Sequence, residues 1–94
     1  MADLPTKFHL IVVTRERKII ETDAVELVLP AYDGEIGVLP GHTPLLALLK
    51  VGIMRYRTNG ESHSLVISWG FVEVLPERVS IHVSLKPAAR LADA

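Results

Sequence analysis

The sequence predicts an all-β fold, an antiparallel β-sandwich or flattened barrel of about eight to ten short strands. Short runs of β-branched and apolar residues recur at the spacing of about 8 to 12 residues that is typical of such folds. Pairs of turn-forming residues separate the runs, at Asp33-Gly34, Pro40-Gly41, Asn59-Gly60 and Pro76-Glu77. The last run, residues 79–85, alternates between apolar and polar side chains, as a strand with one buried face does.

The first part of the chain predicts three strands. Residues 8–14 are largely apolar on both alternating faces, so we expect this strand to be buried on both sides or covered by a partner. Residues 18–22 and 24–29 form the next two strands, with a bend at Asp23 between them. We expect Pro30 to end the third strand, because proline has no N–H to donate to a ladder.

Two rigid turns enclose the strand predicted at residues 35–39. Asp33-Gly34 precedes it, and glycine there accepts positive φ without cost. Pro40-Gly41 follows it and is typical of a type II turn, in which proline presets the first corner and glycine takes positive φ at the second. Residues 45–49 are apolar throughout, and their short length and the Gly52 that follows favour a strand over a helix.

A hairpin is predicted in the second half of the chain. Residues 51–57 and 64–68 flank Asn59-Gly60, which is typical of a two-residue type I′ turn with positive φ at both positions. A glycine-kinked turn at Trp69-Gly70 is expected to lead into the strand at residues 71–75. Trp69 either fills the core or recognises a partner; we favour the core, where its indole N–H would need a hydrogen-bond partner.

The 94 residues form one domain, which we place at residues 1–86. From Pro87 the composition changes to good helix formers, so residues 87–94 are expected to begin a helical segment that is too short to be stable alone. The 49% share of hydrophobic residues is high for so small a domain. Either an apolar patch is left for a partner, or a fold with buried sheet faces uses these residues in its core.

Charge and composition exclude several classes of function. Ten Lys and Arg residues against eleven Asp and Glu residues give a net charge of −1, which argues against nucleic acid as a partner. The absence of cysteine removes disulfides, thiolate metal sites and thiol nucleophiles. No run approaches the roughly 18 apolar residues of a membrane helix, so we expect any membrane association to be indirect.

The polar residues do not predict a catalytic, cofactor or metal site. No two of the four histidines stand at i,i+2 or i,i+4 spacing, so a zinc site would have to be assembled from separate strands without thiolates. Asp33 and Glu35 flank a glycine at an exposed turn with no apolar pocket to raise either pKa, which favours surface charges facing a basic partner over an acid–base pair. The glycines of this stretch do not lead from a strand into a helix, so the loop is not a phosphate cradle.

The stretch at residues 32–49 resembles the signature Gly-Glu-Leu-Gly-x-x-Pro-Gly-His-x-Pro-Leu-Leu of the epsilon subunit of bacterial F-type ATP synthases, called delta in mitochondria. The matching positions are Gly34, Glu35, Gly37, Pro40, Gly41, His42, Pro44, Leu45 and Leu46. The resemblance continues through residues 50–56 and 69–81 and covers roughly residues 7 to 85. One departure is Trp69, which stands where the family has a glycine.

The resemblance implies a non-catalytic rotor subunit in the central stalk of a proton-translocating ATP synthase, where it couples rotation of the c-subunit ring to the gamma subunit. It implies contact with the ring through Tyr32, Asp33, Glu35 and His42. The turns that would hold this contact contain Gly34, Gly37, Pro40, Gly41 and Pro44. It also implies a peripheral position on the cytoplasmic face of a bacterial plasma membrane, and a gamma-facing surface that we expect to be a largely apolar sheet face, with no residue assigned.

Two other functions stay open at this point. The chain could be a free-standing β-sandwich adaptor for protein interaction. It could also be a small-ligand-binding barrel, which would need an interior cavity lined by a few polar groups. The many Val, Ile and Leu residues expected inside leave little room for such a cavity.

Overall fold

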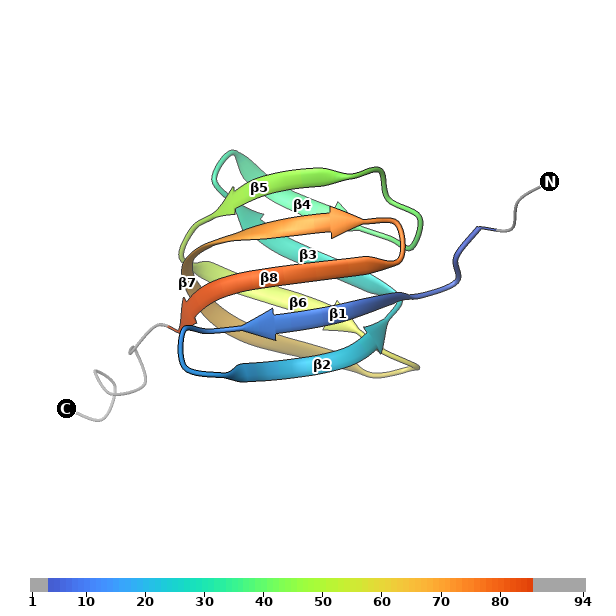
Figure 1. Cartoon of the computed structure of the whole chain (residues 1–94), viewed down its shortest axis with the longest axis horizontal. Coiled ribbons are helices and arrows are strands. Elements are labelled where there is room, and N and C mark those ends of the chain that lie inside the picture. Colours follow the sequence, from blue (N-terminus) through green and yellow to red (C-terminus); the bar gives the residue numbers. More distant parts are fainter. Residues whose placement is uncertain (1–3, 86–94) are drawn as a thin grey trace.

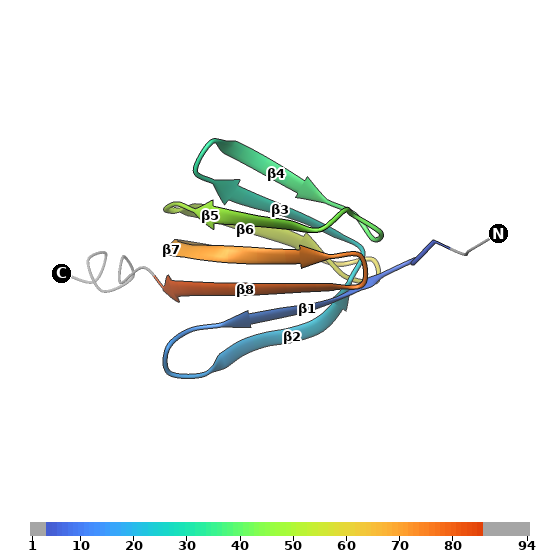
Figure 2. The same cartoon turned by 45° about the horizontal axis from the view of Figure 1, so that its top comes forward.

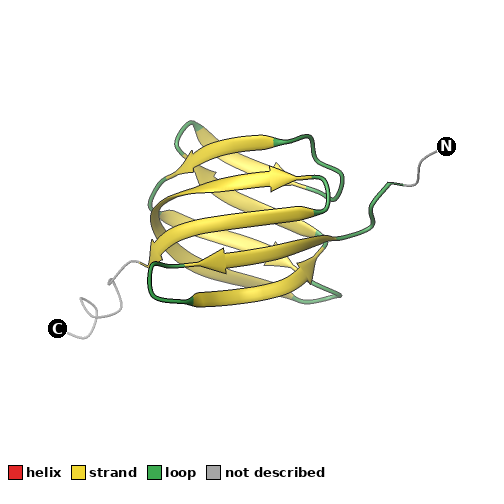
Figure 3. Ribbon diagram, in the orientation of Figure 1, coloured by secondary structure: helices red, strands yellow, loops and turns green. Residues whose placement is uncertain are grey.

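Eight strands make up the computed structural model, which describes residues 4–85 (Figure 1). They are β1 (Phe8–Val13), β2 (Lys18–Ala24), β3 (Glu26–Ala31), β4 (Gly34–Val38), β5 (Leu45–Leu49), β6 (Gly52–Arg57), β7 (Ser62–Leu75) and β8 (Arg78–Leu85). Strands and loops account for the whole of this range (Figure 3). The all-β prediction is therefore confirmed, and the helical start predicted at residues 87–94 lies outside the described residues.

The strands form two layers that share β7 (Figures 1 and 2). In one layer, the second half of β7 pairs with β5 on one side and with β8 on the other, and β8 pairs in turn with β1 and β1 with β2. The first half of β7 pairs with β6, which continues through β3 to β4. A single residue pair, Ala31 with Leu49, joins β3 to β5 at one corner. The result is a β-sandwich with β2 and β4 as outer strands.

One ladder differs from the antiparallel prediction, because β1 and β8 run parallel. The pairing starts where the chain enters β1, and there His9 donates its backbone N–H to the carbonyl of Glu77 at 2.8 Å. Parallel neighbours need a long connection between them, and β1 and β8 stand at the two ends of the sandwich sequence. The alternation of apolar and polar residues within a strand does not indicate whether its neighbour runs parallel or antiparallel to it.

The core lies between the layers and is built from alternate residues of the strands. Within residues 4–85, sixteen hydrophobic residues are buried, and they are Phe8, Leu10, Val12, Ala24, Leu27, Leu29, Ala31, Val38, Leu49, Met54, Ile67, Val72, Val74, Val79, Ile81 and Val83. In β8 the predicted alternation holds as far as Val83, whereas Leu85 is partly exposed. In β1 only one face is fully buried, because His9, Ile11 and Val13 on the other face are half-exposed.

Strand β7 is continuous over 14 residues, so the predicted turn at Trp69-Gly70 is wrong. The register with β8 shifts between Ile67 and Gly70, which marks a bulge where the strand passes from one layer to the other. A Cβ on Gly70 would lie 2.0 Å from the carbonyl oxygen of His82 and 2.8 Å from the Cα of Val83. Glycine is therefore needed for close backbone approach, as it often is within a strand.

Pro30 lies inside β3 and does not end it, contrary to the prediction. Its carbonyl accepts the backbone N–H of Lys50 at 2.9 Å. The backbone N and O atoms of one residue point to the same side of a strand, so the N atom of Pro30 also points toward β5 and Lys50. The N–H that proline lacks is therefore not needed for the ladder with β4. The break between β2 and β3 falls at Val25 and not at the predicted Asp23, since Val25 donates its N–H to the carbonyl of Arg57.

The β6–β7 hairpin is confirmed, but its turn is not type I′. Within this connection only Gly60 has positive φ, at 86°, and no non-glycine residue in the described range does. The ladder ends at the pair Arg57–Ser62, so the connection has four residues, closed by the N–H of Thr58 donating to the carbonyl of Glu61 at 2.8 Å. The longer connection removes the need for positive φ at Asn59.

Replacement of Gly70 by alanine should lower the free energy of unfolding by about 1–3 kcal/mol, because the new methyl group would press on the backbone of β8. Urea unfolding followed by circular dichroism measures the change. Gly37→Ala is the matched control, since a Cβ there meets nothing within 4 Å and φ is not positive. Equal midpoints for the two variants would contradict the close approach at Gly70.

Candidate functional site

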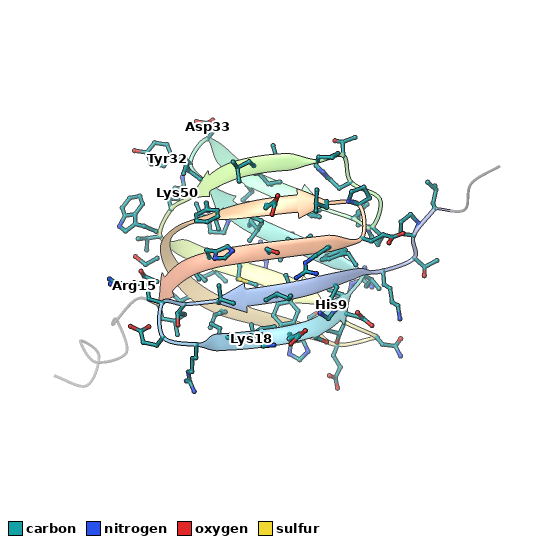
Figure 4. The ribbon with its side chains drawn as sticks, in the orientation of Figure 1. His9, Arg15, Lys18, Tyr32, Asp33 and Lys50 are labelled. Carbon is teal, nitrogen blue, oxygen red and sulfur yellow. The ribbon has the colours of Figure 1, made fainter. Side chains whose placement is uncertain are left out.

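The β3–β4 hairpin turn places Tyr32 and Asp33 at one corner of the sandwich (Figure 4). The ladder closes at the pair Ala31–Gly34, so these two residues form the whole connection. Gly34 has φ of 130°, a conformation that glycine accepts without cost. The backbone N–H of Tyr32 donates to the carbonyl of Leu48 at 3.0 Å, which holds the turn against β5. Both side chains are exposed, that of Tyr32 to 63%.

The second turn, Pro40-Gly41, is the predicted type II turn. Gly41 has φ of 85°, and the N–H of His42 donates to the carbonyl of Leu39 at 3.1 Å. The N–H of Gly41 donates to the carbonyl of Pro76 at 2.8 Å, which ties this turn to the β7–β8 connection. The Nδ1 atom of His42 donates to the carbonyl of Thr43 at 2.6 Å, so the imidazole is held in one orientation.

The four candidate residues lie along one outer strand but do not form one cluster. Strand β4 is the last strand of its layer. Tyr32 and Asp33 stand at its beginning, Glu35 follows within it, and His42 lies beyond its far end. The structure therefore brings the first three together and separates them from His42 by the length of β4. We call β4 with its two turns, residues 32–42, the docking edge.

Glu35 has a partner that the sequence did not predict. Its Oε2 atom accepts a hydrogen bond from the Nη2 atom of Arg55 at 3.3 Å. The two side chains come from β4 and β6, on either side of β3. Both are more than half exposed, so the pair is a weak surface ion pair and Glu35 remains accessible to another cation.

A groove of about 440 Å³ runs beside the docking edge, where β4 and β5 diverge. Its lining includes Tyr32, Asp33 and Glu35 on one side and Leu46 and Leu48 on the other. The groove is open to solvent, whereas a small-molecule site is usually a deep, largely enclosed pocket. The space between the layers is filled by the core side chains, so this geometry favours contact with a macromolecule.

The outer surface of β5 and the second half of β7 carries several exposed apolar side chains. We call four of them the apolar face: Leu46 (71% exposed), Leu48 (65%), Phe71 (42%) and Leu75 (38%). The exposed Glu73 lies among them, opposite Leu46 in the ladder. Leu48 lies opposite Phe71 in the ladder, and the Phe71 ring stacks on that of His82 with centroids 4.6 Å apart. Several exposed apolar side chains on neighbouring strands mark an interaction site better than scattered ones do.

A cluster of charged residues lies at the other edge of the same layer, on β1, on β2 and just before β1. The Nε2 atom of His9 lies 2.8 Å from Glu21 Oε2, and its Nδ1 atom lies 3.3 Å from Asp23 Oδ1. Lys18 pairs with Glu21, and Lys7 pairs with Asp23 at 3.2 Å. Hydrogen bonds with Glu21 and then Asp23 raise the pKa of His9 above its ordinary value of 6.5.

The two carboxylates of this cluster shift in the opposite sense. The hydrogen bond from Lys18, followed by that from His9, lowers the pKa of Glu21 below 4.5. The hydrogen bond from His9, followed by that from Lys7, lowers the pKa of Asp23 below 3.8. Across residues 4–85 no group of three or more His, Asp or Glu side chains is arranged to hold a metal ion. Within the same range no helix is long and apolar enough to cross a membrane.

Comparison with known proteins gives one consistent result. The family model described as the β-sandwich domain of the ATP synthase delta/epsilon chain matches residues 7–85. The ATP synthase epsilon chain of Koribacter versatilis is 38% identical over 74 residues, and that of Chloroflexus aggregans is 44% identical over 73 residues. These alignments cover 79% and 78% of this chain and 52% of each relative, so the chain spans about half the length of these relatives.

A third relative and two solved structures extend the comparison. The epsilon chain of Solibacter usitatus is 36% identical over 90 residues, which cover 96% of this chain and 67% of that protein. A chain of the Euglena gracilis mitochondrial ATP synthase has a TM-score of 0.84 at 24% identity, covering 98% of this chain and 63% of that one. A chain of the Tetrahymena thermophila enzyme has a TM-score of 0.73 at 16% identity, covering 87% and 66%. Both structures share the fold.

The charged cluster predicts a pH dependence of stability. Folding raises the pKa of His9, so protonated His9 stabilises the fold. This contribution to the free energy of unfolding is complete below about pH 6.5, and it is lost as the pH rises through the pKa of His9 in the folded chain. The lowered carboxylate pKa values act in the opposite sense, so their contribution is lost only as the pH falls below about 4.5. Urea midpoints should therefore fall as the pH rises above about 6.5, and should fall less in His9→Gln. An identical fall in both proteins would show that the cluster does not contribute.

Proposed function

Since the chain belongs to the delta/epsilon β-sandwich family of ATP synthase, we propose that it is a non-catalytic rotor subunit of a proton-translocating F-type ATP synthase. In this role it couples rotation of the c-subunit ring to the gamma subunit in the central stalk. It is held on the cytoplasmic face of a bacterial plasma membrane only through the other subunits. The observation that carries the proposal is the docking edge, an exposed outer strand fixed by a turn at each end.

Stiffness is the mechanical property that this role requires. Torque passes between two partners only if the part between them does not deform. Strand β7 belongs to both layers, so a load on one layer is transmitted to the other through continuous backbone. The hydrogen bonds of Tyr32 with Leu48 and of Gly41 with Pro76 fix the two ends of the docking edge to this body.

The docking edge is the surface that we assign to the ring. Asp33 and Glu35 supply acidic charge beside the groove, and the loops of the ring are the basic partner that this charge fits. Each exposed charge pair contributes about 0.2–1 kcal/mol, so complementarity sets orientation and the rate of association more than affinity. His42 lies at the far end of the edge and offers a second, separate contact.

The apolar face is the surface that we assign to the gamma subunit. Its four side chains, Leu46, Leu48, Phe71 and Leu75, are exposed in the isolated chain, and a stable partner would remove them from water. The outer surface of the other layer carries the ion pairs of Glu26 with Arg57 and Glu35 with Arg55, together with one exposed apolar pair, Ile53 with Val66. The two proposed surfaces belong to different strands of one rigid body and meet at the groove between β4 and β5, which residues of both surfaces line.

Reversal of charge at Glu35 should weaken binding to the ring. Glu35→Lys turns an attractive contact with the ring loops into a repulsive one, and we expect about two- to tenfold weaker association and reduced coupling of proton flow to ATP synthesis in reconstituted vesicles. Arg55→Ala is the matched control, because it removes the internal ion pair but leaves the Glu35 carboxylate in place. Full coupling in Glu35→Lys would remove this residue from the ring contact.

Introduction of charge into the apolar face should reduce binding to gamma. The chain should co-purify with the gamma protein at one copy per complex, and Phe71→Lys should lower the recovered amount severalfold because it places a charge in an apolar contact. Val66→Lys, on the same strand and 48% exposed but in the other layer, should have little effect. A wild-type chain that recovers no gamma protein would instead favour a free-standing adaptor.

A further inference from the structure

Trp69 is the only tryptophan of the chain and is 59% exposed, contrary to the expectation that it fills the core. It lies in the bulge of β7, where the neighbouring residues Ile67 and Ser68 are both buried. Gly70 holds this bulge in place through its close approach to β8. The backbone therefore directs the indole of Trp69, the largest side chain of the protein, outward. The epsilon-subunit family has a glycine at this position.

Tyr32 lies beside Trp69, although 37 residues separate them in sequence. The ring centroids are 6.4 Å apart with an interplanar angle of 45°, a geometry favourable for two aromatic rings. Tyr32 is 63% exposed and belongs to the same turn as Asp33 on the docking edge. Figure 4 shows Tyr32, Asp33 and Lys50 at one corner of the sandwich, so one acidic and one basic residue share the corner with Tyr32.

We propose that Trp69 and Tyr32 form the aromatic anchor of the ring-docking surface and pack against the loops of the c-subunit ring. This inference rests on the proposed function. Charge pairs at an exposed edge are weak and screened by salt, so an edge made of Asp33 and Glu35 alone would hold its partner poorly. Tyrosine and tryptophan supply a large, rigid contact area and a polar group at the rim, which is why they dominate binding energy at interfaces.

The ring fits this corner better than gamma does. The aromatic pair is continuous with the docking edge, because Tyr32 itself is part of the β3–β4 turn. The apolar face assigned to gamma is centred on β5 and the second half of β7, beyond the bulge, and it borders this corner at Phe71, two residues after Trp69. Trp69 thus extends the ring contact around the end of the sandwich and gives it an apolar centre with a charged rim.

The intrinsic fluorescence of the chain tests this directly, since all indole emission comes from Trp69. The chain is titrated first with purified gamma protein and then with the purified c-subunit ring in detergent micelles. We expect the emission maximum to move to shorter wavelength and iodide quenching to fall when the ring is added to the chain–gamma complex. Gamma alone, ring-free micelles and lipid vesicles should cause no such change.

Binding to immobilised ring provides the second measurement. Trp69→Ala should weaken binding of the chain–gamma complex about tenfold or more, Trp69→Phe should retain part of it, and Val66→Ala on the same strand should leave it unchanged. Trp69 is exposed, so its replacement leaves the core intact, and an unchanged urea midpoint verifies this.

The possible failures are distinguishable. If the ring binds but the emission and the affinity of Trp69→Ala do not change, the anchor is wrong and the proposed function stands. If gamma alone, or lipid without the ring, shifts the emission, Trp69 belongs to that partner and the ring assignment is overturned. If the chain–gamma complex binds no ring at all, the proposed function fails and the anchor fails with it.

Discussion

One strand that belongs to two layers is the constraint on which this sandwich depends. Strand β7 must bend between Ile67 and Gly70 and still pair with β6 before the bend and with β5 and β8 after it. Gly70 permits this because its backbone lies against the carbonyl of His82, where no side chain fits. This bend of β7 sets how the two layers face each other. The core between them, the docking edge and the outward position of Trp69 all depend on it.

The sandwich is not closed equally on all sides, and its proposed function uses the open side. Strands β3 and β5 share only the pair Ala31–Leu49, so β4 and β5 diverge and leave a groove between the layers. The turns at the two ends of β4 compensate for the missing ladder, because each donates a backbone N–H to the main body. An outer strand fixed at both ends can present polar side chains to a partner without being pulled from its sheet.

Local chemistry was sufficient to predict the fold class and several turns. Gly34 and Gly41 take the positive φ that their positions imply, and Val79, Ile81 and Val83 face inward as their alternation predicts. Errors arose where long-range contacts override a local rule. Pro30 is tolerated within a strand because its missing donor faces a corner, and Gly70 marks a bulge because β8 passes close to it.

The candidate site was predictable in its residues but not in its arrangement. The motif identified Tyr32, Asp33, Glu35 and His42, and the strand predicted between the two turns already placed His42 at the far end, but only the topology shows that this strand is the outer strand of its layer. The ion pair of Glu35 with Arg55 depends on the order of β4, β3 and β6, which no spacing in the sequence encodes. Exposure of Trp69 depends on a shift of register, and composition alone favours burial of such a residue.

The parallel pairing of β1 with β8 has a consequence for how the protein is made. Strand β1 leaves the ribosome long before its neighbour β8, so the layer that contains both cannot be completed until synthesis has passed residue 85. Until then β1 and β2 form an isolated hairpin, which is at best marginally stable in water. Folding of this domain is therefore expected to be late and cooperative, since its most distant segments must meet before the layer can close.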